Sequence, residues 1–592
     1  MMTPRQEKPV DVVMVGLGWT NSIIGMEMTD AGLNVLALEQ GADRETVPDF
    51  SYPQMADELT YGVRYKLMRR PAANTVTVRH SIGDTALPYR NLGSFLPGDG
   101  VGGAGSHWNG QSWRPMPEEL YLRTYVEEKF GKDMIPEDMT IQDFGVSYEE
   151  LEPHFDFFEK VMGISAQAGN LQGKIQPGGN PFEGPRQNPY PLPPLPRTLN
   201  DTLFAKAASQ KGLHPFPMPA VNASQAYTNP YNMQLGPCNF CGFCERYGCI
   251  NYSKASPQTC ILGALKQRNN FAYRTHSEVI KINVDDSGKK ATGVTYINGE
   301  GETIFQPADI VIVGSFAYNN VRLLLLSKIG QPYDPVTNTG TVGRNYAYQM
   351  TGGASVFFKD KTFNPFIDTG ANGEVIDDFA INQIDFRKER FIGGSYINAG
   401  MTNGQPIRNM PLPSGTPSWG SQWKKAVKDN YGHVMSIGSH GSNMSYRDCY
   451  LSLDPTYKDR HGLPLLRMTF NWKENDIKMT QFMKRQIESI VEVMKPDSAK
   501  YGFKDFGSKY DVRPYQSTHN VGGAIMGTTP KNSVLNRYLQ SWDVHNVFVM
   551  GASAFPQNIQ YNPTLLVGAL TYWSAKAIRE RYIPNPGPLV QA

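Results

Sequence analysis

Apolar residues near the start of the chain are grouped in a way that predicts a strand, a helix and a second strand. Residues 10–15 are almost all apolar and predict a buried strand. A turn at residues 16–18 leads into an apolar, helix-compatible stretch that ends at Ala31, and residues 35–39 predict the second strand. The pattern therefore predicts a complete β-α-β unit.

Two later segments repeat this order of strand and helix. Residues 308–313 predict a strand followed by a helix at 319–327, and residues 546–550 predict a strand followed by a helix at 563–580. Strands that alternate with helices form parallel sheets. We therefore expect the three segments to meet in one sheet although they are far apart in the chain.

The middle of the chain has a different pattern. Residues 181–237 are dense in proline and asparagine and predict an ordered coil or an extended covering arm. Between residues 350 and 468, apolar and polar residues alternate in short runs such as 353–358 and 380–386. This alternation predicts a sheet that forms a second domain.

Length and composition agree with at least two globular domains. The chain has 592 residues, whereas a single core stops growing at roughly 250–300 residues. Its residues are 40% hydrophobic and 19% charged, which excludes a disordered or fibrous protein. The formal net charge of +2 lacks the basic excess that nucleic-acid binding requires. We expect no nucleic-acid partner.

Hydropathy indicates no membrane span and no secretory signal. Every apolar run is shorter than the roughly 18–20 residues that cross a bilayer. Residues 1–11 are polar and contain no apolar segment of the kind that a signal peptide needs. If the chain is exported, we expect another protein to carry the signal.

The turn after the first strand has the features of a dinucleotide site. Gly16 and Gly18 allow the backbone to approach a pyrophosphate at a helix N-terminus. Glu39, at the end of the second strand, can accept hydrogen bonds from ribose hydroxyls. Asn21 stands where the usual fingerprint has a third glycine. A simple glycine turn is the alternative, but the strand, helix and acidic residue in register favour dinucleotide binding.

A glycine-rich loop at residues 98–110 is too long for a hairpin and resembles the flavin-embracing segment of the glucose-methanol-choline (GMC) oxidoreductase family. Further matches at residues 277–279, 310–327 and 343–345 follow the order of that family. The resemblance implies FAD as the cofactor. The implied FAD-binding residues are Gly16, Gly18, Glu39, Gly102, Gly103, Ser106, His107, Asn109, Gly110, Val279, Gly551, Ala552, Asn562 and Thr564.

The resemblance also implies the GMC fold, with a Rossmann-like α/β FAD-binding domain and a sheet-based substrate domain, α+β overall. We expect residues 1–117, 236–330 and 505–592 to form the FAD-binding domain. This domain includes the segment with four clustered cysteines at residues 238–249, called the cysteine loop below. Residues 118–235 and 331–504 are expected to form the substrate or cap domain.

His107 is a candidate for covalent attachment of the flavin. The run Ser106-His107-Trp108 resembles the loop of pyranose 2-oxidase in which a histidine is bonded to the flavin 8α carbon. An imidazole nitrogen can attack that carbon only if it is held beside the dimethylbenzene edge. The alternative is a histidine that only packs on the flavin or bonds loop carbonyls.

Residues 517–527 resemble the family block that opens with the catalytic histidine, which falls on His519. Alcohol oxidation requires a base for the hydroxyl proton while the carbon-bound hydrogen leaves as hydride, and neutral histidine suits that role. The second catalytic position of the family falls on Asn562. Asparagine cannot take the proton, but it can orient the hydroxyl.

Four of the six cysteines are crowded into one short segment with a C-x₂-C-x₂-C start, which is typical of iron-sulfur proteins. A structural zinc site usually needs two separated pairs, and disulfides or free thiols are a third alternative. The resemblance implies a [3Fe-4S] cluster with three ligands, so one cysteine can be a bystander. The preferred ligands are Cys238, Cys244 and Cys249, and Cys241 is the doubtful fourth.

The cysteines and residues 109–114 look most like the large subunits of membrane-associated dehydrogenases for gluconate, ketogluconate, fructose, glucose and sorbitol. The resemblance implies oxidation of a sugar acid, sugar or polyol, with D-gluconate to 2-keto-D-gluconate as the expected reaction. Electrons would pass through the cluster to a multihaem cytochrome c subunit, since this chain has no C-x-x-C-H motif. A small subunit would carry the export signal, which places the complex on the periplasmic face of the bacterial inner membrane.

Two other functions are compatible with parts of this pattern. An oxygen-using carbohydrate oxidase would share the fold, and a non-catalytic electron-transfer flavoprotein would use the cluster only as a conduit. The pair His519 and Asn562 argues against the second alternative, because electron transfer alone needs no proton acceptor.

Overall fold

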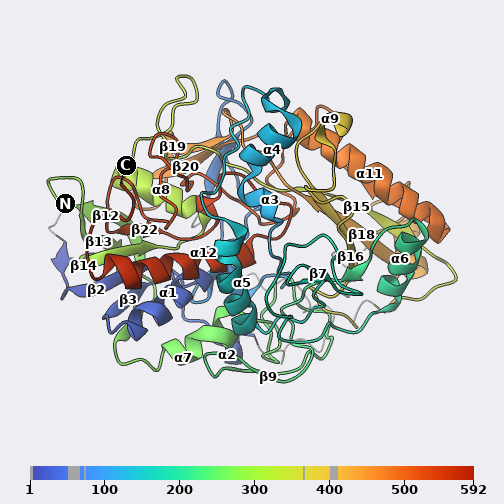
Figure 1. The fold of residues 1–592 in the computed structure, drawn as a ribbon, viewed down its shortest axis with the longest axis horizontal. Helices are drawn as coiled ribbons and strands as arrows, with labels where there is room; N and C mark the ends of the chain where they lie inside the picture. Colours follow the sequence, from blue (N-terminus) through green and yellow to red (C-terminus); the bar gives the residue numbers. More distant parts are fainter. Residues whose placement is uncertain (1–3, 51–66, 72–74, 365–366, 401–410, 592) are drawn as a thin grey trace.

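The computed structural model describes residues 4–50, 67–71, 75–364, 367–400 and 411–591. Two main sheets lie toward opposite ends of the long axis of the molecule, with helices packed over each (Figure 1). The mixed α/β fold that the sequence predicts is confirmed.

The larger sheet has eight strands in the order β11-β3-β2-β14-β13-β12, and β1 and β22 also pair with β14. The pairs β11–β3, β3–β2, β2–β14 and β14–β22 are parallel, whereas β14, β13 and β12 form an antiparallel meander. The bounds are β1 (Arg5–Gln6), β2 (Val10–Val15), β3 (Val35–Leu38), β11 (Phe271–Arg274), β12 (Glu278–Val284), β13 (Ala291–Ile297), β14 (Thr303–Val313) and β22 (Val547–Val549).

Helices cover this sheet because its central strands are apolar on both faces. Strands β3 and β22 are buried along their whole length, and such strands need cover on both sides. Helix α12 packs between α1 and α5, while α8 packs on β12. The bounds are α1 (Trp19–Asp30), α5 (Tyr148–Met162), α8 (Ala317–Ser327) and α12 (Thr564–Ala577), and a π-helical turn (Ile578–Tyr582) extends α12.

All three predicted strand-helix segments are confirmed. The β-α-β unit is β2-α1-β3, with α1 ending one residue before Ala31. The segments β14-α8 and β22-α12 join it, because β14 pairs with both β2 and β22. Strand β14 therefore brings three distant parts of the chain into one sheet.

The second sheet is antiparallel, in the order β21-β15-β18-β17-β16-β8. Apolar residues on one face, among them Val356 and Ile437, form a core with Phe204 of α6 and Ile490 of α11. The bounds are β8 (Phe216–Pro217), β15 (Met350–Phe357), β16 (Glu374–Ile376), β17 (Ser395–Gly400), β18 (Val434–Gly441), β21 (Ser498–Gly502), α6 (Leu199–Gln210) and α11 (Glu474–Met494).

A third sheet, β19-β20-β4-β5, joins strands from both predicted domains. Strand β4 lies in the expected FAD segment 1–117 but pairs with β20 of the expected cap segment. The predicted domain boundaries stay a prediction. The bounds are β4 (Val76–Arg79), β5 (Leu87–Pro88), β19 (Tyr450–Lys458) and β20 (Pro464–Thr469), and the shorter elements are β6 (Asn170–Leu171), β7 (Lys174–Ile175), β9 (Tyr227–Thr228), β10 (Gln234–Leu235), α2 (Thr46–Asp49), α3 (Pro117–Leu120), α4 (Leu122–Phe130), α7 (Gly263–Leu265), α9 (Phe386–Glu389) and α10 (Ser421–Asn430).

Two local predictions are wrong. Residues 380–386 form turns and the start of α9 instead of a strand, because Asp385 caps that helix by accepting hydrogen bonds from the backbone N–H groups of Arg387 and Lys388. The predicted coil at 181–237 contains α6. A capping box begins this helix, in which the Thr198 N–H donates to the Asp201 carboxylate.

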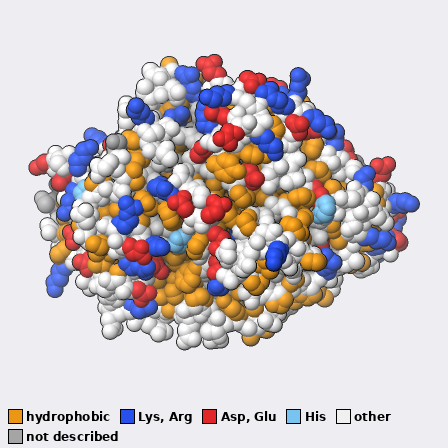
Figure 2. Space-filling view, viewed as in Figure 1, with side chains coloured by type: hydrophobic (Ala, Val, Ile, Leu, Met, Phe, Trp, Pro, Cys, Tyr) orange, Lys and Arg blue, Asp and Glu red, His pale blue; other side chains and the backbone are white. Residues whose placement is uncertain are grey.

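Charge and hydropathy of the fold agree with the composition. On the face shown in Figure 2, acidic and basic side chains are mixed, as expected from the formal net charge of +2. Within the described part of the chain, the helices are too short or too polar to cross a bilayer.

Candidate active site

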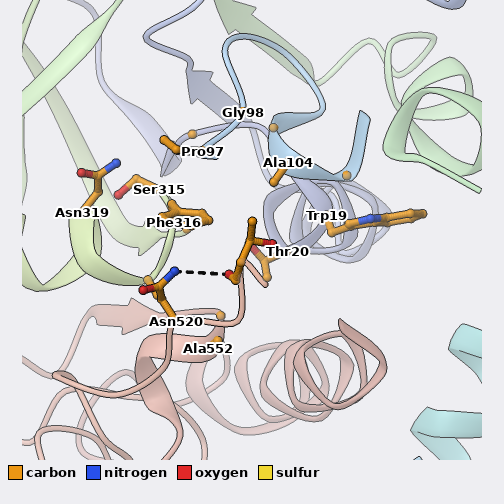
Figure 3. Close-up of a pocket in the computed structure, with 18 of the residues that line it drawn as sticks. Trp19, Thr20, Pro97, Gly98, Ala104, Ser315, Phe316, Asn319, Asn520 and Ala552 are labelled. Carbon is orange, nitrogen blue, oxygen red and sulfur yellow. Dashed lines mark hydrogen bonds between the residues drawn. The ribbon is translucent and has the colours of Figure 1, made fainter. Parts of the chain in front are cut away.

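A cavity of about 400 Å³ lies where the carboxyl ends of β2, β3 and β14 approach β18 of the second sheet. Ligands of open α/β sheets bind at this end of the strands. Thr20, Ala104 and Phe316 reach its edge from three separate segments (Figure 3). The predicted residues that line it are Gly16, Gly18, Glu39, Gly103, His107, Asn109, Gly110, Val279, His519, Gly551, Ala552, Asn562 and Thr564.

The turn between β2 and α1 has the conformation that a pyrophosphate site requires. Gly16 has a φ of +87°, and a Cβ there would lie 2.8 Å from the Gly314 carbonyl oxygen. Glu39 accepts hydrogen bonds from the N–H groups of Leu17 and Gly41 at 3.0 and 2.9 Å. Burial raises the pKa of Glu39, which these bonds oppose. Glu39 also lines the cavity, so its carboxylate could accept hydrogen bonds from the ribose hydroxyls of a dinucleotide.

Asn21 replaces the third glycine without disturbing the packing of helix on strand. Its Nδ2 donates to the carbonyl oxygens of Val15 and Gly16, both at 2.8 Å, and the side chain is fully buried. The asparagine thus fixes the turn by hydrogen bonds where the fingerprint uses close packing.

Gly102 and Ser106 lie behind the cavity wall, so two of the predicted FAD-binding residues are not brought to the surface of the cavity. Gly102 has a φ of +93°, and a Cβ there would lie 2.2 Å from Nε2 of Gln258. The same Nε2 donates to Ser106 Oγ at 3.0 Å. Both residues shape the glycine-rich loop through Gln258.

Three buried polar atoms of residues that line the cavity have no hydrogen-bond partner among the described residues. They are Nε2 of His107, Oδ1 of Asn109 and Nε1 of Trp19. A buried polar group left without a partner costs about 1–3 kcal/mol, so at a cavity wall such atoms are available to a bound ligand. Together with the glycine turn they fit a bound FAD.

His519 and Asn562 meet at the wall of the cavity. His519 lies in the loop after β21, and Asn562 directly precedes the N-terminus of α12. The distance from His519 Nε2 to Asn562 Nδ2 is 3.4 Å. Asn562 Oδ1 accepts a hydrogen bond from the Tyr396 hydroxyl at 3.0 Å, which directs Nδ2 toward the histidine. The two residues can both form hydrogen bonds with one substrate hydroxyl.

Burial keeps His519 neutral. Burial, together with the neighbouring His440, lowers the pKa of this histidine to about 3. A neutral ring has a lone pair available for a proton, as a general base requires.

The cavity contains polar residues that the sequence analysis missed, namely Gln111 and His440 in its wall, with Gln349 and Tyr396 behind them. They come from the loop before α3 and from the region of strands β15, β17 and β18. His440 could have been noticed from alternation, because it shares a strand face with Ser436 and Gly438, opposite the core residues Met435 and Ile437.

The cysteine loop (residues 238–249) lies beside the glycine-rich loop at residues 98–110, called the flavin loop below. The Arg246 N–H donates to the His107 carbonyl oxygen at 2.7 Å, and Arg246 itself lines the cavity. The buried ammonium of Lys254 donates to the carbonyl oxygens of Trp108, Cys244 and Tyr247, each at 2.7 Å. These contacts connect two segments that are more than 100 residues apart.

The four clustered cysteines are not arranged as a formed metal site. Asn222 Nδ2 lies 3.8 Å from Cys238 Sγ and 3.6 Å from Cys244 Sγ, and the Lys254 N–H donates to Cys249 Sγ at 3.4 Å. Over the described residues, however, no group of three or more His, Cys, Asp or Glu side chains is placed to hold a metal ion. The iron-sulfur assignment stays a prediction.

Comparisons with known proteins agree with the geometry. Two family models, both described as GMC oxidoreductase, match residues 218–351 and 445–571. The chain is 53% identical to the gluconate 2-dehydrogenase flavoprotein of Pantoea cypripedii, over 99% of this chain and 96% of that protein. It is 23% identical to the fructose dehydrogenase large subunit of Gluconobacter japonicus, over 96% and 97%. The structure of pyridoxine 4-oxidase from Mesorbium loti aligns with a TM-score of 0.58 at 15% identity, over 96% and 98% of the two chains.

Proposed function

The chain belongs to the GMC oxidoreductase family, and from this premise we propose that it is the flavoprotein subunit of a dehydrogenase that oxidises D-gluconate to 2-keto-D-gluconate. As a member of this family it is an FAD-dependent oxidoreductase acting on CH–OH groups. The choice of gluconate is supported by 53% identity to a gluconate 2-dehydrogenase flavoprotein along almost the whole chain. The observation that carries the reaction type is the pair His519 and Asn562 in the wall of the FAD cavity.

The side chains divide the reaction between them. Asn562 Nδ2 donates a hydrogen bond to the oxygen of the substrate hydroxyl and holds its proton toward His519. His519 Nε2 takes that proton as the carbinol becomes a carbonyl. A bound FAD would supply the acceptor for the hydride that leaves the same carbon.

The substrate is tested by a screen of sugars, sugar acids and polyols on the purified complex with an artificial dye as acceptor. D-Gluconate is expected to give the highest kcat/KM. A better substrate of another class would refute the gluconate assignment but leave the dehydrogenase intact. Reoxidation of the reduced flavin by dioxygen as fast as by the dye would favour a carbohydrate oxidase instead.

We propose that His107 bonds the flavin covalently. Its Nε2 is buried and has no hydrogen-bond partner in the described part of the chain, and burial lowers the pKa of the ring to about 4, so the ring is neutral near neutral pH. A neutral imidazole at a cavity wall is a competent nucleophile toward an electrophilic carbon of a bound cofactor. The new N–C bond would replace a C–H bond of the flavin 8α carbon, whose proton would be released and whose two electrons would be taken up by the flavin ring and passed on to the enzyme's own electron acceptor.

Acid-denatured protein is therefore expected to stay yellow, and the His107→Ala variant is expected to release its flavin on denaturation while keeping the fold. The measurement is the absorbance of flavin in the precipitate and in the supernatant. The His440→Ala variant, also altered at a cavity histidine, should retain the yellow precipitate. Complete release from the unaltered protein would contradict the covalent bond.

We also propose that Cys238, Cys244 and Cys249 hold an iron-sulfur cluster of the [3Fe-4S] type, with Cys241 as the doubtful fourth ligand. The spacing supports this, and so do two donors beside the sulfur atoms, the Asn222 amide and the Lys254 N–H, since donors favour anionic sulfur. Such a cluster would supply a one-electron relay next to the flavin loop.

The remaining parts of the complex are proposals as well. The fructose dehydrogenase relative is named a large subunit, which supports the presence of partner subunits. We propose that a multihaem cytochrome c subunit receives the electrons and that a small subunit carries the export signal. The complex would then work on the periplasmic face of the bacterial inner membrane, with membrane contact through the partners.

A further inference from the structure

One buried amide, that of Gln349, holds two imidazole rings of the cavity. Gln349 is fully buried and directly precedes β15. Its Nε2 donates to the carbonyl oxygens of Gln560 and Tyr561, at 3.1 and 3.3 Å. These bonds use both amide hydrogens. Oε1 therefore faces the opposite way and can only accept hydrogen bonds.

The partners of Oε1 are the Nδ1 atoms of two histidines. One is Nδ1 of His519, in a short contact, and the other is Nδ1 of His440 at 3.2 Å. An amide oxygen carries no proton, so each Nδ1 must carry one for both hydrogen bonds to form. The lone pair of each neutral ring is then on Nε2.

His440 is placed to act on the substrate. It lies on β18, and its ring stacks on Tyr396 of β17 with 5.3 Å between centroids and 23° between planes. The centroids of His440 and His519 are 6.2 Å apart, and both residues line the cavity. Burial lowers the pKa of His440 to about 4, so near neutral pH it is an uncharged acceptor.

We propose that Gln349 is a positioning residue that holds both histidines as Nδ1–H tautomers, and that Nε2 of His440 accepts a hydrogen bond from a second hydroxyl of the substrate. The inference deepens the proposed function, on which it rests. The two histidine rings would favour substrates with hydroxyls on neighbouring carbons, because two such hydroxyls can each reach one ring by a hydrogen bond of about 2.8 Å. In gluconate the C2 hydroxyl would face His519 and the C3 hydroxyl would face His440.

The ionisable groups behind this arrangement are two buried carboxyls. Glu119 accepts from the Gln560 N–H, and Asp377 accepts from the Tyr561 hydroxyl. Burial raises the pKa of Glu119 to about 8 and that of Asp377 to about 7. Each variant must therefore be compared with the unaltered protein at the same pH, so that Glu119 and Asp377 have the same protonation in both proteins.

The role of His440 is tested by a substrate-variant cycle with D-gluconate and 3-deoxy-D-gluconate. In the unaltered protein the deoxy compound is expected to lose about tenfold in kcat/KM, the worth of one hydrogen bond. In His440→Phe, which keeps the stacking on Tyr396, gluconate should fall by a similar factor and the two substrates should become equivalent. A matched control is His433→Phe, since His433 lies just before the same strand and bonds the Lys361 carbonyl oxygen.

Two results of this cycle would overturn the assignment of His440. One is an undiminished preference for gluconate in His440→Phe, and the other is the absence of any preference in the unaltered protein. If gluconate is not oxidised but another polyol reduces the flavin, the proposed substrate fails by itself. The cycle is then run with that polyol and its deoxy analogue.

The role of Gln349 is tested by two variants with opposite signatures. Gln349→Met removes the acceptor and should slow flavin reduction by about 10²-fold, the loss expected for a misplaced group, without moving the pH profile. Gln349→Glu places a carboxylate beside both Nδ1–H groups, which favours imidazolium and raises its pKa. The acidic limb of the rate profile should therefore move to higher pH.

An unchanged pH profile in Gln349→Glu would show that Gln349 does not face the two rings. A normal rate in Gln349→Met would show that the two histidines do not depend on Gln349 for the Nδ1–H tautomer. If Gln349→Met does not retain FAD, the profile of Gln349→Glu and the His440 cycle decide the proposal.

Discussion

Replacing His519 by alanine is expected to slow the reduction of bound FAD by substrate about 10²–10⁴-fold, while FAD stays bound. The hydride cannot leave efficiently while the hydroxyl keeps its proton, and the neutral amide of Asn562, whose Nδ2 lies 3.4 Å from His519 Nε2, is too weak a base to take that proton. The measurement is anaerobic stopped-flow bleaching of the flavin. Near-normal bleaching would mean that another group takes the proton.

A matched control for this variant is His545→Ala, since His545 bonds the Tyr582 hydroxyl outside the residues that line the cavity. The pH profile adds a second check. With a lowered pKa of about 3, His519 is unprotonated at and above neutral pH, so the base is ready throughout that range. The rate should fall only in acid, as pH drops toward the pKa of the ring. A limb near neutral pH would point to a different group, such as Asp377.

The sequence could predict those parts of the site that can be recognised within one short, continuous segment. Gly16, Gly18 and Glu39 belong to one β-α-β unit, and its strand and helix periods are local. His519 and Asn562 could be placed because each stands inside a continuous block that resembles a family motif. Such features need no knowledge of how distant segments pack.

The rest could not be predicted because it depends on strand pairing. Gln349 directly precedes β15, whereas Tyr396 and His440 lie on β17 and β18, and the three residues meet only through the registers of these strands. The alternation in β18 places His440 on the polar face of that strand, but it does not show which residues that face meets. The start of α6 is different, because Thr198 and Asp201 have the local spacing of a capping box, a signal that the prediction of coil did not use.

Replacing Cys244 by serine is expected to remove the iron of the proposed cluster and to stop electron transfer to the cytochrome, while substrate still bleaches the flavin. The reason is that substrate oxidation and electron transfer to the cytochrome would use different groups. Hydride transfer delivers two electrons at the wall formed by His519 and Asn562, whereas a thiolate-bound cluster handles single electrons. The cysteine loop contacts the flavin loop through the Arg246 N–H and the His107 carbonyl oxygen, so the relay would begin beside the cofactor.

The measurement combines iron content, stopped-flow flavin bleaching and cytochrome reduction in one preparation. Cys260→Ser is the matched control, because Cys260 is also buried but lies apart from the cysteine loop in sequence, and it should keep both iron and cytochrome reduction. Since the buried Cys244 can be needed for folding, Cys238→Ser, at a partly exposed cysteine, repeats the test. Iron-free unaltered protein, or normal cytochrome reduction in both variants, would refute the relay. Zinc in that iron-free protein would make a structural zinc site the better account of residues 238–249, because a metal without redox chemistry could hold the loop but could not pass electrons.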